Sequence, residues 1–187
     1  MSNIPGYLQD AQTLLTKHGF TTSDVWYHGT SSALVHSIKE QGLKRSGDRA
    51  IKQAAKKTMA TIGNHYTESI EPVFLTQSKE LAWYWAQQTV RNRMVRFEET
   101  ETPVVLAVKL PEELLSEVKP DVGARSLLLL PEGEHYLARL AIIAERCGIE
   151  PPAIDLMKAD RMEFLNTLGM AYIDRDIPAE CIEEIKA

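Results

Sequence analysis

The sequence has few cysteines, no long apolar run and no excess of positive charge. Its two cysteines, Cys147 and Cys181, lie far apart, so neither a disulfide framework nor a thiolate metal site is indicated. The longest apolar run, "SLLLLP", is much shorter than a membrane span, and the N-terminal residues lack the features of a secretion signal. We therefore expect a cytoplasmic protein with no membrane partner.

The charge and the length of the chain indicate which partners and how many domains to expect. A net charge of −5 and a pI near 5.6 argue against a protein that mainly coats nucleic acid, and no DNA partner is expected. With 187 residues, of which 44% are hydrophobic, the chain is long enough for one domain with a substantial core. We expect residues 1–187 to form a single domain.

The order of the expected elements indicates an α+β protein. Strand-like segments such as "DVWY", "PVFLTQ" and "TPVVLAVKLP" are interspersed with helices of unequal length, without a regular βαβ rhythm. The chain contains no Walker loop, no GxGxxG and no GxSxG nucleophile motif. The histidines show no metal-ligand spacing, and no metal site is expected.

The stretch "YHGTSS" places several polar groups between a strand and a helix. Gly29 lets its backbone approach a flat ligand closely, and Thr30 and Ser31 offer hydroxyls at the start of the helix Ser32–Gln41. Thr30 or Ser31 can also cap that helix. His28 could equally be a structural histidine that ends a strand. The pattern nevertheless favours a nucleotide site at this turn.

A cationic segment follows that helix. Residues 44–57 contain six cations and one acid, Asp48, with little apolar period, which predicts a long loop with at most one helical turn. Within this segment, Arg45 and Arg49 are the side chains best suited to a phosphate, because a guanidinium group binds phosphate oxygens in a bidentate manner.

Four stretches together resemble the ADP-ribosyltransferase superfamily, which includes diphtheria toxin, the poly-ADP-ribose polymerases and the RNA 2′-phosphotransferases. "YHGTSSALVHSIKEQGL" is similar to its first motif, and "VFLTQSKELAWYWA" to its second. "VVLAVKLP" fits the strand that follows, and "YIDRDIPAECIEEI" resembles the closing strand. The resemblance covers roughly residues 25–110 and the C-terminal end, and leaves the helical segment 121–168 unaccounted for.

The resemblance implies an α+β split β-sandwich, in which two sheets form an NAD cleft surrounded by helices. His28 would bind the adenosine ribose of NAD, and the Gly29 backbone would hold the nicotinamide carboxamide. Tyr84 would stack on the nicotinamide ring beside Thr76, and Thr30 would belong to the same cofactor site. His28 and Tyr84 would then be the catalytic residues. Tyr84 stands between two tryptophans on a helix, where an aromatic cluster can also be core.

The family uses an acidic residue at the start of its last strand to stabilise the ribosyl cation. In this chain the corresponding register holds Met170 or Ala171, which cannot serve. Asp174 lies further along the same strand, and Glu132 or Glu134 could approach from the segment that the resemblance does not cover. The acid is left unassigned among these three.

The implied function is NAD-dependent transfer of ADP-ribose to a macromolecular acceptor, protein or RNA. One alternative is an enzyme like the RNA 2′-phosphotransferases, in which Arg45 or Arg49 would hold an RNA phosphate. Another is a degenerate module that binds NAD or ADP-ribose without cleaving it. The missing acid favours the degenerate module.

Overall fold

The computed structural model describes residues 4–61, 70–97, 99–121, 123–151, 153–155 and 157–187. Its strands are β1 (Leu15–Thr16), β2 (Gly19–Phe20), β3 (Val25–Ser31), β4 (Val73–Thr76), β5 (Pro103–Lys109), β6 (Lys119–Pro120), β7 (Met170–Ile173) and β8 (Ile182–Glu184). Its α-helices are α1 (Ala11–Leu14), α2 (Ser32–Gln41), α3 (Arg49–Thr61), α4 (Lys79–Met94), α5 (Glu112–Leu115), α6 (Ala124–Leu127), α7 (Pro131–Arg146) and α8 (Arg161–Glu163). Short 3₁₀ turns η1 (Gly6–Leu8) and η3 (Ala179–Cys181) and a π-turn η2 (Phe164–Leu168) complete the described elements.

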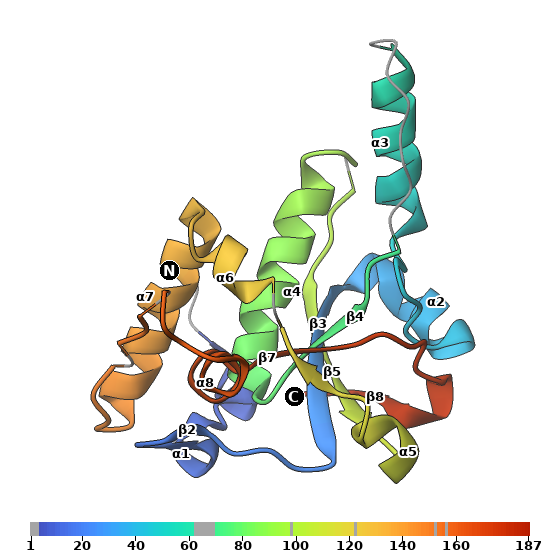
Figure 1. Ribbon diagram of the computed structural model, residues 1–187. Coiled ribbons are helices and arrows are strands. Elements are labelled where there is room, and N and C mark those ends of the chain that lie inside the picture. The colour runs from blue at the N-terminus through green and yellow to red at the C-terminus, as the bar shows by residue number, and fades with distance from the viewer. Residues whose placement is uncertain (1–3, 62–69, 98, 122, 152, 156) are drawn as a thin grey trace.

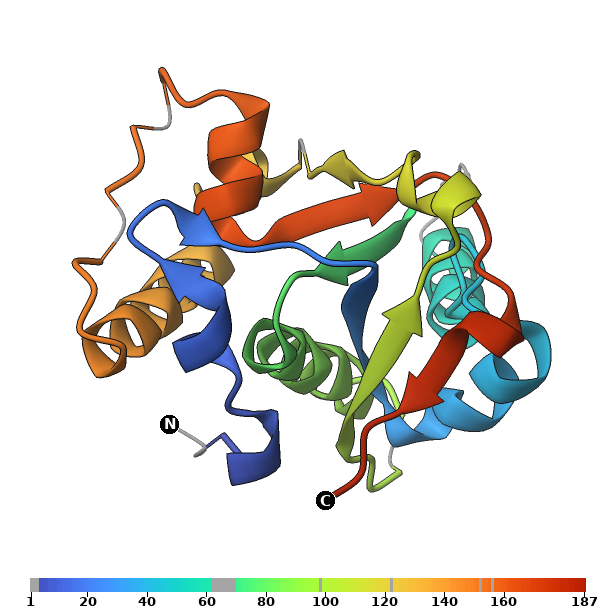
Figure 2. The same cartoon turned by 90° about the horizontal axis from the view of Figure 1, so that it is seen from below.

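The expected α+β class is confirmed, and the central feature is an antiparallel sheet in the order β6-β7-β4-β3-β5-β8 (Figure 2). β3 pairs with β5 along its whole length, whereas its pairing with β4 in the described chain consists of Tyr27 opposite Thr76. The sheet therefore has two three-stranded halves that meet at a single residue pair. The two sheets expected from the sequence are instead one sheet that opens at this point.

One face of the sheet carries the main core. Alternate residues of β4 and β7, such as Val73, Leu75 and Ile173, are buried on this face together with Leu106 and Val108 of β5. α2 closes against it through Ile38. Because strand side chains alternate between faces, the residues between these positions must lie on the opposite face. That opposite face holds both α4 and the candidate site.

α4 packs directly across β3 and β5 (Figure 1). Gly29 allows this close approach, because a Cβ at this position would lie 2.0 Å from the carbonyl oxygen of Ala82 and 2.5 Å from the nitrogen of Ala86. Ser78 caps α4 by accepting a hydrogen bond from the backbone nitrogen of Glu80, as its type and position predict. α4 is therefore fixed against the strand that carries "YHGT".

The helical segment 121–168 forms a second core with α4. Tyr136, Leu140 and Ile143 of α7 are buried with Tyr84 of α4, and the Tyr136 hydroxyl donates to the carbonyl oxygen of Leu168. In Figure 1, α6 and α7 stand beside α4 on the side away from α2 and α3. The part of the chain without a counterpart in the resemblance is thus an integral part of the fold.

Around α2 and α3, one expectation about local structure is confirmed and another is wrong. Ser31 caps α2 by accepting a hydrogen bond from the nitrogen of Ala33, and Gly42 ends it with a φ of 80°. The expected loop at residues 44–57 was wrong, because residues 49–61 form helix α3, which projects from the body (Figure 1). Its alanines and lysines favour a helix strongly enough to form one with little burial. None of the described helices has the length and apolar character that crossing a bilayer requires.

Candidate functional site

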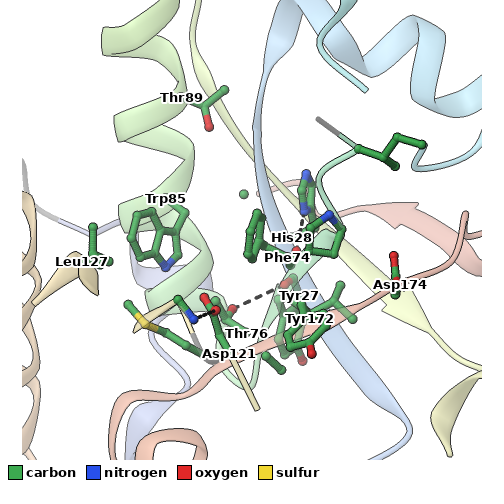
Figure 3. A pocket seen from close by; sticks show the side chains of 17 residues that line it. Tyr27, His28, Phe74, Thr76, Trp85, Thr89, Asp121, Leu127, Tyr172 and Asp174 are labelled. Carbon is green, nitrogen blue, oxygen red and sulfur yellow. Dashed lines mark hydrogen bonds between the residues drawn. The ribbon is translucent and has the colours of Figure 1, made fainter. Parts of the chain in front are cut away.

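A cavity of about 650 Å³ lies where the sheet opens between β3 and β4 (Figure 3). Its volume falls within the range of small-molecule sites in proteins. The residues that line it come from β3, β4, α4, β7 and the segment around α6, and they are Tyr27, His28, Gly29, Ile70, Pro72, Phe74, Leu75, Thr76, Trp85, Thr89, Asp121, Gly123, Leu127, Met170, Ala171, Tyr172 and Asp174. Sequence segments separated by more than a hundred residues therefore meet at one site.

Strand register supplies the floor of the cavity. Phe74 lies opposite Tyr172 in the β4–β7 ladder, and Thr76 lies opposite Met170. These four residues share the face that does not carry the main core, because strand side chains alternate. Asp174 continues the same alternation just beyond β7. The Phe74 side chain is 46% exposed although it is aromatic, because the cavity lies against it.

α4 supplies one wall through Trp85 and Thr89, four residues apart on one helix face. Tyr84 does not line the cavity, since its ring points toward α7, where its hydroxyl donates to the carbonyl oxygen of Glu132 at 2.7 Å. Its ring meets that of Tyr136 edge-on. Of these two neighbours, Trp85 lines the cavity and Tyr84, which was expected to do so, does not.

His28 bridges the two halves of the sheet next to their single residue pair. Its Nδ1 lies 2.8 Å from the carbonyl oxygen of Phe74 (Figure 3). A carbonyl can only accept, so Nδ1 carries the proton and Nε2 of the neutral ring is an acceptor. Burial lowers the pKa of His28, and the hydrogen bond to Phe74 opposes this only in part. The ring is therefore neutral near pH 7. Its hydrogen bond connects β3 with β4 at the point where the two halves of the sheet separate.

The other residues expected at the site divide into two groups. Gly29 and Thr76 line the cavity, and the Thr76 hydroxyl donates to the carbonyl oxygen of Ser78 at 3.0 Å. Thr30 is buried at 1% exposure and does not line the cavity. Arg49 is exposed at the start of α3, also outside the cavity lining.

The structure brings an acid to the cavity that the sequence reasoning did not consider. Asp121 follows β6 directly and enters the cavity from the wall that α6 continues. Burial raises the pKa of this carboxyl group, an effect that the backbone hydrogen bond from Gly123 to Oδ1, at 2.7 Å, reduces. The only sequence signal was the Asp-x-Gly spacing, which indicates a turn rather than a site.

The three acids considered from the sequence differ in position. Asp174 lines the cavity, with its side chain 62% exposed and its Oδ1 atom 3.5 Å from Nη1 of Arg45. Glu132 and Glu134 lie in the first turn of α7 and do not line it. Asp121 and Asp174 are thus the carboxylates at the cavity, and Asp121 is the more buried of the two.

The character of the cavity is aromatic and acidic. Its described lining contains two carboxylates, one histidine and several aromatic rings, but no lysine or arginine. In the described part of the chain, no three histidine, cysteine or acidic side chains are grouped as a metal ion would require. Comparison of the chain with models of protein families and with curated proteins found no match.

Proposed function

We propose that this protein cleaves NAD at the bond between nicotinamide and ribose and transfers the ADP-ribose to a macromolecular acceptor. The observation that carries the proposal is the cavity at the opening of the sheet. It joins the "YHGT" strand to aromatic rings and a partly buried carboxylate. His28, which joins the two halves of the sheet through its hydrogen bond to Phe74, lines the same cavity and supports the proposal.

The charge of the cavity suits the nicotinamide end of NAD. In intact NAD the nicotinamide ring is a planar cation, and aromatic faces attract such cations. Trp85 and Phe74 offer rings from different walls of the cavity (Figure 3). The carboxylate of Asp121 adds favourable charge, and so does that of Asp174, although Arg45 partly offsets the latter.

The same groups can support the chemical step. The C1′–N1 bond breaks, its electron pair leaves with neutral nicotinamide, and positive charge develops on the ribose. A carboxylate beside this cation stabilises the transition state, as carboxylates do in glycoside cleavage. The acceptor then bonds to C1′ and releases its proton to the solvent. We assign the carboxylate role to Asp121, because it is more buried than Asp174 and forms no ion pair in the described chain.

The pyrophosphate needs a cation that the described lining does not contain. Arg45 is placed to supply one, since it pairs with Asp174 at the edge of the cavity. An RNA 2′-phosphotransferase reaction would require this arginine or Arg49 to hold an RNA phosphate. Arg49 lies outside the cavity lining, so Arg45 is the better placed of the two for that role.

The test is calorimetric titration with NAD, followed by an assay for free nicotinamide. We expect the wild-type protein to bind NAD and release nicotinamide. Asp121→Asn should retain binding and lose about 100-fold or more in release rate, because the amide cannot balance the developing charge. Asp174→Asn is the matched control, with a much smaller expected loss of rate.

Two outcomes would contradict this assignment. Binding by the wild-type protein without release, in the presence of protein and RNA acceptors, would favour the degenerate NAD-binding module. Failure to bind NAD, with His28→Ala behaving like the wild type, would mean that "YHGT" serves the fold alone.

A further inference from the structure

We infer that the cationic face of α3 binds the phosphate backbone of a nucleic acid. α3 carries four positive charges and no negative charge, although the whole chain has a net charge of −5. This segregation of charge is the first observation. A local cationic strip on an acidic protein retains a polyanion that the rest of the surface repels.

The helix places its cations on one side. At 100° per residue, Arg49, Lys52 and Lys56 form a single stripe, with Lys57 at its edge. Ile51, Ala54 and Ala55 lie on the other side and are half-buried, whereas Arg49, Lys56 and Lys57 are exposed. Met59 is the large apolar side chain exposed on this helix, so the exposed side offers mainly charge and little of the apolar area that protein interfaces and membrane surfaces use.

The three exposed cations of α3 are not neutralised by neighbouring acids. Arg45, Arg93, Arg146 and Arg175, by contrast, each pair with a carboxylate. In the described chain, Arg49, Lys56 and Lys57 pair with none. Their charges are thus available to phosphate groups.

The position of α3 connects this strip to the cavity. Asp48, directly before α3, pairs with Arg93 of α4 at 2.5 Å. Arg45 pairs with Asp174, which lines the cavity. α3 therefore begins near the edge of the cavity and projects outward (Figure 1). A bound strand would be an acceptor held beside the site. That acceptor role rests on the proposed function, whereas the binding itself does not.

The test is fluorescence anisotropy with labelled oligouridine and oligodeoxythymidine of equal length, across a range of salt concentrations. The variant Arg49→Gln/Lys56→Gln/Lys57→Gln is compared with Lys17→Gln/Lys109→Gln/Lys186→Gln, which loses the same charge at exposed sites elsewhere. We expect the α3 variant alone to bind at least tenfold more weakly. Its slope of log affinity against log salt should be smaller by about 2, because three phosphate contacts are lost.

Each outcome bears on the proposal. The proposal is supported if either oligonucleotide binds and the α3 substitutions weaken that binding more than the control substitutions do. The oligonucleotide that binds more tightly shows whether the natural ligand is RNA or DNA. Equal effects of both triple variants, or equally tight binding of polyglutamate, would overturn it. Nicotinamide release without an acceptor is measured on the same variants and should not change. If the wild-type protein binds the oligonucleotides but releases no nicotinamide from NAD, only the proposed function is refuted.

Discussion

At the scale of single residues, His28 joins the chemistry of the site to the geometry of the sheet. Its Nδ1 donates a hydrogen bond from β3 to the Phe74 carbonyl oxygen of β4, and His28 also lines the cavity. A ligand would therefore meet an acceptor nitrogen that the fold itself holds in place. This dual position means that the protonation of His28 affects both stability and binding.

The lowered pKa of His28 predicts a dependence of stability on pH. The unfolded chain takes up a proton near pH 6.5, whereas the folded protein takes it up only at a lower pH, because burial disfavours the charged ring. His28 therefore contributes stability above pH 6.5, and this contribution is lost as the pH falls toward the folded-state pKa. Between pH 6.5 and 5.5 we expect a loss of up to about 1 kcal/mol relative to His28→Gln.

Urea unfolding of both proteins at several pH values measures this difference. His28→Gln is a suitable comparison, because its amide can still donate to the Phe74 carbonyl oxygen but does not titrate. Parallel pH profiles for the two proteins would show that His28 titrates equally in the folded and unfolded states.

At the scale of elements, the contact between α4 and β3 sets the wall of the cavity. Gly29→Ala would place a Cβ within 2.0 Å of a backbone oxygen of α4, so the helix must move. We expect a loss of about 3 kcal/mol in the free energy of unfolding, at the high end for overpacking. Displacement of Trp85 with α4 should also weaken ligand binding.

Gly6→Ala provides the control for this substitution. A Cβ at Gly6 meets nothing within 4 Å, and Gly6 itself is exposed. Chemical denaturation should therefore show little change for Gly6→Ala. Equal stability of the two variants would mean that α4 can move away from β3 at little cost.

At the scale of the whole molecule, a buried ion pair ties the helical segment to the rest. Glu80 of α4 is fully buried and pairs with Arg146 at the end of α7, and it accepts a hydrogen bond from the nitrogen of Ala11. Three separate parts of the chain meet at this carboxylate. We expect Arg146→Met to cost about 3 kcal/mol of stability, because it leaves a buried charge without its partner.

The double variant Glu80→Gln/Arg146→Met separates this effect from a simple loss of packing. Removing both charges leaves no uncompensated carboxylate, so the double variant should recover much of the stability that Arg146→Met loses. Thermal or urea unfolding of the three proteins measures the recovery. A double variant as unstable as Arg146→Met would place the cost in the lost arginine packing instead.

The sequence by itself determined the α+β class, the extent of α2 and the cap of α4. It also predicted a strand at "DVWY", but the residues expected to form a turn after it, His28 to Ser31, continue that strand as part of β3. These features depend on local signals: alternation of apolar residues, hydroxyl caps and a terminating glycine. It failed at α3, because the cationic composition was interpreted as a loop although alanine and lysine both favour a helix.

Only the tertiary structure decided the composition of the site. Trp85 and Tyr84 are neighbours in the sequence, and the packing of α4 against α7 determines which of them faces the cavity. Asp121 comes from a segment without a recognisable motif, and the pairing of β6 with β7 brings it to the cavity that β3 also lines. Local propensity cannot specify such contacts, because they depend on which surfaces pack together once the sheet and its helices have formed.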